Sequence, residues 1–150
     1  MTVAVESTET VEREIRIDAA PETVFAFFTD PELLLRWKGL DATLEPEPGG
    51  VYRVVMNEEA TVLGRFLEVE PPTRVVFSWG MAGEDPLVTP GASTVEVTLT
   101  ADGEGTLLRL VHRDLPARAR DAHARGWEHY LERLRVAAGG DDPGPDPWAS

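Results

Sequence analysis

The sequence contains no cysteine, which excludes disulfide bonds, thiolate metal sites and a cysteine nucleophile. The same absence is typical of proteins kept in a reducing compartment, so we expect a cytoplasmic protein. No run approaches the ~18 apolar residues that a membrane-spanning helix needs, and no membrane insertion is expected. Residues 1–9 also lack the basic start and the apolar run of a signal peptide.

Basic residues are scarce relative to acidic ones. The chain has 14 Lys and Arg against 27 Asp and Glu, and its net charge is −13. A field of this sign repels phosphate backbones and anionic membrane surfaces. We therefore expect no nucleic-acid partner.

Recognisable catalytic and metal-binding motifs are missing too. None of the serines lies in a GxSxG elbow, and no HExxH motif or cluster of histidines and carboxylates appears. The string Asp102–Gly105 lacks the lysine and the following helix of a phosphate-binding loop, so a hairpin turn explains it better. We expect no metal and no cofactor.

The sequence does contain a series of short alternating segments separated by turn residues. Val95, Val97 and Leu99 alternate with polar residues, which is typical of a strand with one solvent-exposed face. Strands separated by turns rather than by helices indicate an antiparallel sheet. Pro21 and Pro31 stand where two short helices begin. The expected strands cover residues 11–17, 41–45, 51–56, 61–70, 74–79, 93–100 and 106–112.

The last regular element is a long amphipathic helix over Pro116–Ala138, with Asp114 as its start signal and Gly139 at its end. One stripe of this helix, from Ala119 onward, collects apolar and aromatic residues and should face the sheet. Gly126, beside this stripe, would let the helix approach a strand closely. A strand, two short helices, a run of antiparallel strands and a long final helix form an α+β layout.

Both ends of the chain depart from this pattern. Residues 1–10 show no periodicity, and residues 139–150 combine Gly, Pro and Asp densely. We expect a disordered N-terminal segment over residues 1–10, one folded domain over residues 11–138, and a disordered, dispensable acidic tail over residues 139–150.

Four groups of residues, in this order along the chain, carry a family resemblance: Ile17–Pro21 with Asp30–Glu32 and Trp37; Gly49–Tyr52; Gly64 with Val69–Arg74 and Trp79; and Gly105–Thr106 with His123–Trp127. The chain resembles the SRPBCC superfamily, also called START-like or birch-pollen-allergen-like. Within it, the sequence is most similar to the family of activators of the 90-kDa heat-shock-protein ATPase. The resemblance implies a helix-grip fold, in which a curved antiparallel sheet with two short helices wraps around the long C-terminal helix. The superfamily includes lipid-transfer, polyketide-cyclising, hormone-binding and chaperone proteins, and the family name implies a role in the stress response.

The three histidines differ in their expected positions. His129 lies on the polar face of the long helix and is expected at the surface. His112 shares the parity of the apolar residues in its strand, and His123 lies on the apolar stripe of the helix, so both should point inward. Two interpretations stay open: two core histidines, each satisfied by a hydrogen bond, or two polar groups in a hollow pocket.

Aromatic residues supply most of the other candidates. Trp37 follows the second short helix and is expected at the rim of a pocket, whereas Phe77 and Trp79 have the inward parity of their strand. Arg120, one turn before His123, is a candidate for meeting an acidic head group, with a solvated or salt-bridged arginine as the alternative. The candidate ligand-binding residues are His123, Tyr130, His112, Trp37, Phe77, Trp79, Trp127 and Arg120.

These features favour a non-enzymatic protein that binds a small, mostly apolar molecule, such as a lipid, a polyketide or an aromatic metabolite, for transport, sensing or sequestration. One alternative is a co-chaperone of the 90-kDa heat-shock protein, which rests on the resemblance. The other is a polyketide cyclase or hydrolase that uses His112, His123 or Tyr130 as acid or base. As a partner we expect the small molecule, with a chaperone as the alternative, and the chain itself a monomer or a weak dimer.

Overall fold

A computed structural model describes residues 8–83 and 88–148. Within these residues the chain forms seven strands and three helices, in the order that the sequence predicts. In chain order the elements are β1 (Thr8–Ile17), α1 (Pro21–Thr29), α2 (Pro31–Leu34), β2 (Asp41–Leu44), β3 (Val51–Val55), β4 (Thr61–Glu70), β5 (Arg74–Trp79), β6 (Ser93–Asp102), β7 (Gly105–Pro116) and α3 (Ala117–Ala138).

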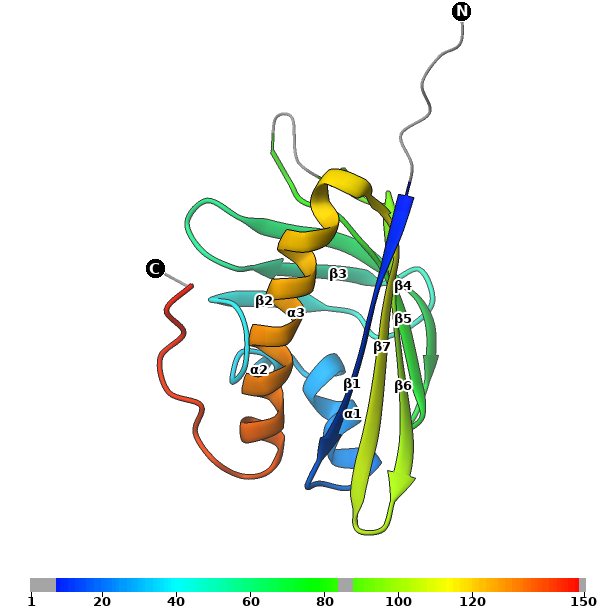
Figure 1. Ribbon diagram of the computed structural model, residues 1–150, viewed down its shortest axis with the longest axis vertical. Coiled ribbons are helices and arrows are strands. Elements are labelled where there is room, and N and C mark those ends of the chain that lie inside the picture. The colour runs from blue at the N-terminus through cyan, green and yellow to red at the C-terminus, as the bar shows by residue number, and fades with distance from the viewer. Residues whose placement is uncertain (1–7, 84–87, 149–150) are drawn as a thin grey trace, which may run out of the picture.

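The seven strands form one sheet in the order β1-β7-β6-β5-β4-β3-β2, and every neighbouring pair is antiparallel. The sheet is strongly curved, α3 crosses its concave side, and α1 and α2 lie beside the C-terminal half of α3 (Figure 1). This arrangement confirms the α+β, helix-grip fold. No helix within the described residues is both long enough and apolar enough to cross a membrane.

Two predicted boundaries differ most from the structure: β1 begins at Thr8 rather than at residue 11, and the last strand continues where the sequence suggests the start of a helix. The end of β7 still pairs with β1, through Thr8 opposite Pro116 and Glu9 opposite Leu115. Asp114 has a left-handed backbone conformation, with φ of 63°, inside this strand and does not cap a helix. The helix α3 begins after Pro116, and no side chain caps its first turn.

The strand β4 changes partners along its length, and the sheet bends there. Its first half pairs with β3 and its second half with β5. At the junction, Gly64 lies so close to β5 that an added Cβ would stand 1.8 Å from the carbonyl oxygen of Ser78. The amide of Arg65 donates a hydrogen bond to the Ser78 hydroxyl at 2.9 Å. Only glycine permits this approach, so Gly64 holds the bend that sets β2 and β3 across the direction of β6 and β7 (Figure 1).

The core lies between the sheet and the helices, and aromatic rings fill much of it. Tyr52 on β3 stacks on Phe77 on β5 with ring centroids 4.1 Å apart, and Phe66 on β4 packs edge-on against both. Trp37, which follows α2, donates its indole N–H to the carbonyl oxygen of Phe27 in α1 at 3.0 Å. This bond joins the two short helices and fixes the chain just before Lys38.

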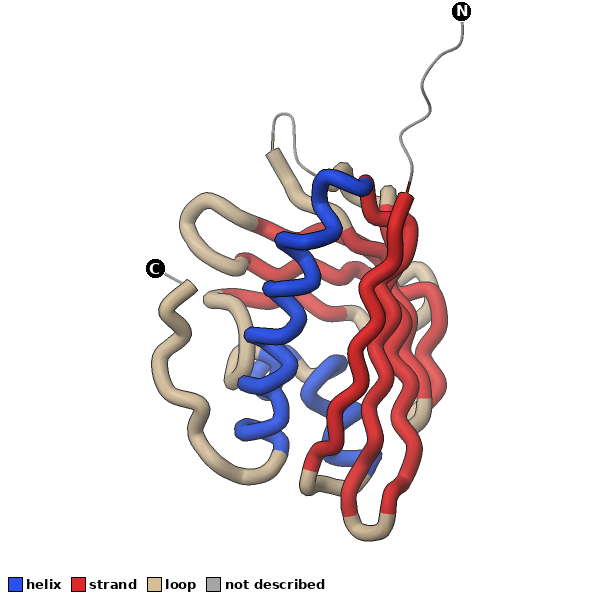
Figure 2. Tube along the Cα trace, viewed as in Figure 1, coloured by secondary structure: helices blue, strands red, loops and turns tan. Residues whose placement is uncertain are grey.

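The C-terminal residues run back along α3 (Figure 2). The guanidinium group of Arg133 donates to the carbonyl oxygens of Gly144 at 3.0 Å and Pro143 at 3.4 Å. It also donates to the carbonyl oxygen of Trp37 at 3.0 Å, so one side chain joins the tail, α3 and the segment after α2. This differs from the disorder expected for residues 139–150, because composition does not show which polar partners α3 offers. For residues 1–7 and 149–150 the expectation lies outside the described residues.

Candidate functional site

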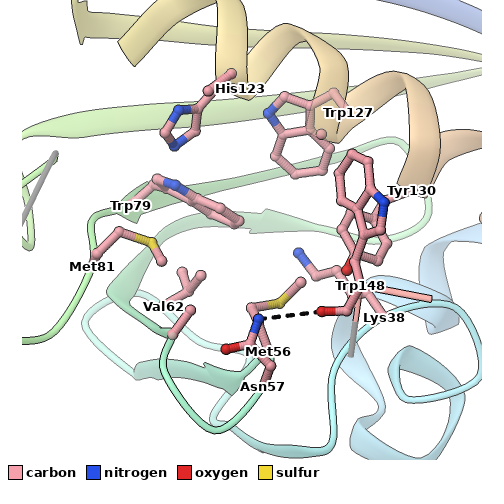
Figure 3. A pocket seen from close by; sticks show the side chains of 13 residues that line it. Lys38, Met56, Asn57, Val62, Trp79, Met81, His123, Trp127, Tyr130 and Trp148 are labelled. Carbon is pink, nitrogen blue, oxygen red and sulfur yellow. Dashed lines mark hydrogen bonds between the residues drawn. The ribbon is translucent and has the colours of Figure 1, made fainter. Parts of the chain in front are cut away.

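A pocket of about 220 Å³ lies between α3, the β3–β4 hairpin, the end of β5 and the C-terminal tail (Figure 3). The hairpin contributes Met56 and Val62, and Met81 follows β5. Most of the lining side chains are apolar or aromatic. The lining residues on α3 are Ala122, His123, Gly126, Trp127 and Tyr130.

Lys38 points into this pocket from inside a box of aromatic rings (Figure 3). Its ammonium nitrogen is 4.8 Å from the ring centre of Trp79 and 5.1 Å from that of Trp127. The ring centres of Trp37 and Tyr52 lie 5.1 Å and 5.6 Å away. Ring faces at these distances attract a cation, so the rings rather than a counter-ion hold the ammonium form.

Among the described residues, no carboxylate accompanies this lysine. Lys38 is only 2% exposed, and within the described residues it forms neither a hydrogen bond nor a salt bridge. Burial lowers the pKa of Lys38 to about 7, so a large fraction of the molecules carry an uncharged amine at neutral pH. Lysine is almost never fully buried without a partner, and ionisable groups perturbed in this way are concentrated at functional sites.

His112 is a core residue with both ring nitrogens engaged. The indole N–H of Trp127 donates to His112 Nδ1 at 3.0 Å, which leaves the ring proton on Nε2, 2.8 Å from the Ser93 hydroxyl. That hydroxyl donates in turn to the carbonyl oxygen of Trp79 at 2.9 Å. Burial is the main cause that lowers the pKa of His112 to about 2, so the ring is neutral. His112 therefore holds two tryptophans of the pocket wall in place from the core side, Trp127 directly and Trp79 through Ser93.

His123 occupies the α3 wall of the pocket beside Trp79 (Figure 3). Its Nδ1 is 2.9 Å from the carbonyl oxygen of Ala119, one turn earlier. Because a carbonyl oxygen only accepts, Nδ1 carries the proton and Nε2 remains a hydrogen-bond acceptor. Burial lowers the pKa of His123, partly offset by the bond to Ala119, so this residue is an uncharged polar group at neutral pH.

The C-terminal tail supplies another wall. Trp148 stacks on His129 with ring centroids 4.1 Å apart and stands edge-on to Tyr130. The Asp146 carboxylate accepts hydrogen bonds from the Tyr130 hydroxyl at 2.7 Å, from the His129 ring at 2.9 Å and from the Trp148 amide at 2.9 Å. Asn57 in the hairpin donates to the carbonyl oxygen of Trp148 at 3.2 Å (Figure 3). The tail thus covers His129, which the sequence places at the surface.

The structure brings only part of the predicted site together. Trp37 lies fully buried behind the lysine rather than at a rim, and Phe77 packs in the core. Arg120 forms surface ion pairs with Glu9 at 3.7 Å and Asp121 at 3.2 Å and does not line the pocket. Strand parity and helix angle indicate which way a side chain points but not how deep it lies. The predicted residues that do line the pocket are His123, Tyr130, Trp79 and Trp127.

Sequence reasoning missed Lys38 and gave Trp148 no role. A signal for Lys38 is present, since it is the only lysine in a chain whose other basic residues are all arginine. Trp148 is a large aromatic residue in a Pro/Gly-rich tail, where nothing in the local pattern requires one. Gly126 does not serve a close helix–strand contact, because nothing lies within 4 Å of an added Cβ and the residue faces the pocket.

In chemical terms the site is an apolar cavity faced by an amine at Lys38 and an imidazole acceptor at His123. Among the described residues no three His, Asp or Glu side chains gather in a way that would hold a metal ion. The cavity suits an apolar body packed against the rings, oriented by one donor and one acceptor.

The curved sheet, the long helix across it and the pocket between them define a START-like, helix-grip protein. The family model described as Activator of Hsp90 ATPase homolog 1-like protein matches residues 18–139. The chain belongs to this family, which confirms the resemblance seen in the sequence.

Solved structures and curated relatives agree with this assignment. The AHSA1-like protein of Rhizobium etli is 45% identical, with 100% of this chain and 94% of that chain covered and a TM-score of 0.76. DynU16, from the dynemicin biosynthetic locus, is 26% identical, with 91% of this chain and 50% of that chain covered and a TM-score of 0.75. The human activator of 90 kDa heat shock protein ATPase homolog 1 is 29% identical over 124 residues, 80% of this chain and 34% of the human protein. The chain thus spans about a third of the length of the curated relatives it matches.

Proposed function

We propose that this protein binds a small, mostly apolar molecule in the pocket between α3 and the β3–β4 hairpin, for transport, sensing or sequestration. The observation that carries the proposal is the cavity itself, whose walls include Trp79, Trp127 and Met56 and whose polar groups are few. Sites of this composition are typical of small-molecule binding. Among the described lining residues there is no serine, threonine or cysteine for a base to activate, which favours binding over catalysis by such a nucleophile.

The size of the cavity limits the ligand. A cavity of about 150 Å³ holds benzene, and sites for drug-sized ligands begin at about 300 Å³. The volume of about 220 Å³ lies between these values. We therefore propose a ligand with one or two fused rings, or a larger molecule of which only such a part enters. The likeness to DynU16, which comes from the dynemicin biosynthetic locus, supports a biosynthetic metabolite over a membrane lipid.

The experiment fills the pocket from the helix side. Since nothing lies within 4 Å of an added Cβ at Gly126, Gly126→Leu puts a side chain into the cavity without displacing the core. Gly126→Ala is the matched control, because it gives a similar gain in helix propensity, about 0.8–1 kcal/mol, and leaves most of the volume. Calorimetric titration with 1-naphthalenemethanol, a neutral bicyclic probe, should show micromolar binding to the native protein and to Gly126→Ala but not to Gly126→Leu.

Two results would contradict the proposal. Equal binding to all three proteins means that the probe sits elsewhere, and binding to none means that the cavity is not a ligand site. Native mass spectrometry of the protein as purified gives the mass of a retained molecule, which identifies its class independently of the probe.

A second candidate is a co-chaperone role with the 90-kDa heat-shock protein, favoured by the family match and by the likeness to the human activator. The side chains available for an apolar contact with a chaperone come from three different segments. Among the described residues, the most exposed large ones are Leu40, Leu67 and Trp148. The test is the ATPase rate of that chaperone with and without this chain. Stimulation would support the role, and an unchanged rate would oppose it.

The cyclase or hydrolase alternative has less support. Of the three residues proposed as acid or base, His112 and Tyr130 use their polar atoms in internal hydrogen bonds. Only the third, His123, faces the cavity with a free acceptor. A cytoplasmic location and a monomeric or weakly dimeric state remain parts of the proposal.

A further inference from the structure

We infer that the ligand carries one acidic group, a carboxylate or an acidic phenol, and that Lys38 binds this group at the inner end of the pocket. The inference rests on the proposed function and deepens it, because it names the chemical class of the ligand. It is carried by a set of buried hydrogen-bond donors that have no acceptors.

Two donors of the pocket wall, the Lys38 amine and the Trp79 indole N–H, have no hydrogen-bond partner among the described residues. The Tyr52 hydroxyl, on a buried ring beside Lys38, is also without one. Buried polar groups in folded proteins are nearly always hydrogen-bonded, so an unpartnered amine facing the cavity favours an acceptor that the ligand brings. An ionised acid is an acceptor only, and it also supplies the negative charge that the buried ammonium group lacks.

The other titratable groups around the lysine do not provide that charge. The His112 ring is neutral with both nitrogens bonded, and His123 carries its proton on the side facing Ala119. The Asp146 carboxylate is saturated by three donors of its own. No anionic group of the described residues therefore pairs with Lys38. The other titratable groups on the described elements packed around it are Tyr52, His112, His123, Tyr130, Arg133 and Asp146.

Binding of an acid to Lys38 should take up a proton above neutral pH. In the free protein, burial lowers the pKa of Lys38 to about 7, and a carboxylate beside the ammonium group raises it again. Between these two pKa values the complex holds a proton that the free protein lacks. The affinity for an acid should then fall about tenfold for each pH unit above 7, whereas the affinity for a neutral ligand should not change.

The experiment compares 1-naphthoate with 1-naphthalenemethanol, which share a ring system and differ in charge. Both are titrated calorimetrically into the native protein and into Lys38→Met, which keeps an unbranched apolar stem and removes the amine. We expect the native protein to bind naphthoate at least about tenfold more tightly than the alcohol at pH 7, and to lose most of this preference by pH 8.5. Lys38→Met should show no preference for the acid, so that the ratio of the two affinities falls to about one.

A second measurement does not depend on any variant. Because Lys38 is the only lysine, its side-chain NMR signals titrate without overlap from other lysines, and saturating naphthoate should move its pKa upward. Equal binding of both probes, a preference that survives Lys38→Met, or an unmoved lysine pKa would overturn the inference and leave the proposed function standing. Binding of neither probe would overturn both.

Discussion

Lys38→Met is expected to raise the free energy of unfolding at neutral pH, because it removes a buried amine that has no anionic partner among the described residues. In the unfolded chain this amine returns to water and to its ordinary pKa of 10.5, whereas in the folded protein burial lowers the pKa to about 7. The unfolded state therefore binds the proton more tightly than the folded state, and protonation favours unfolding.

The magnitude follows from the pKa difference and from the rings. A fall from 10.5 to about 7, at about 1.4 kcal/mol per pH unit, sets an upper bound of ~5 kcal/mol. The surrounding rings offset part of this, since a desolvated cation–π interaction contributes about 2 kcal/mol. We expect Lys38→Met to be more stable than the native protein by about 1–3 kcal/mol at pH 7, which is similar to the gain found when buried ion pairs are replaced by apolar residues of similar volume.

The pH dependence gives the sharper signature. The folded pKa of Lys38 is depressed, so its destabilising effect is fully present below about pH 7 and disappears as the pH rises toward 10.5. In urea denaturation at pH 7, 8 and 9, the free energy of unfolding of the native protein should rise relative to that of Lys38→Met by up to ~1.4 kcal/mol per pH unit. Lys38→Arg, which cannot deprotonate, should be less stable than the native protein throughout. Equal stabilities and parallel pH curves for the native protein and Lys38→Met would refute the reasoning.

Three further outcomes follow from the contacts. Trp127→Ala should lose about 3–5 kcal/mol in chemical denaturation, as buried aromatic truncations do, and a loss under about 1 kcal/mol would mean that the ring carries little packing. His112→Leu should lose about 2–4 kcal/mol because two buried partners lose their hydrogen bonds, while His123→Leu should lose less than about 1 kcal/mol, with equal losses counting against the assigned roles. A chain ending at Ala138 should melt lower at neutral pH, by about 2–4 °C for each kcal/mol that the tail contributes. Burial raises the pKa of Asp146, but the hydrogen bonds that it accepts lower it overall, so the melting difference should shrink as the pH falls below 3.8. A truncation without effect would restore the dispensable tail expected from composition.

The fold could be predicted from the sequence because the spacing of apolar residues along a strand or a helix shows directly which side chains are buried. Along β6, Val95, Val97 and Leu99 are buried while Thr98 and Thr100 are exposed, as their alternation predicts. The helix stripe works in the same way at its own period. The end of β7 was mispredicted because pairing with β1 outweighs a local helix-start signal near Asp114. A local sequence pattern of this kind carries no information about the tertiary partner, here β1, whose pairing overrides it.

The site is less predictable because it depends on which distant residues meet in space, whereas a local pattern shows only the direction in which each side chain points. The rings around Lys38 belong to residues 37, 52, 79 and 127, and no local pattern brings these four positions together. A lysine next to a tryptophan at the end of a short helix is normally solvent-exposed. The tail poses the same problem, since the three donors that Asp146 collects depend on where the chain turns after Gly139.

The net charge of −13 and the single buried lysine act on an acidic ligand in opposite directions. The surface carboxylates repel an approaching anion at long range, and this repulsion is screened beyond a Debye length of about 10 Å at 0.1 M salt. The contact with Lys38 lies in a water-poor, aromatic site, where salt screens it much less. Added salt should therefore speed the association of 1-naphthoate, as measured by stopped-flow fluorescence, and leave its dissociation nearly unchanged. The neutral alcohol should show no such dependence. Slower association of the acid at higher salt would mean that exposed basic groups, rather than Lys38, receive it.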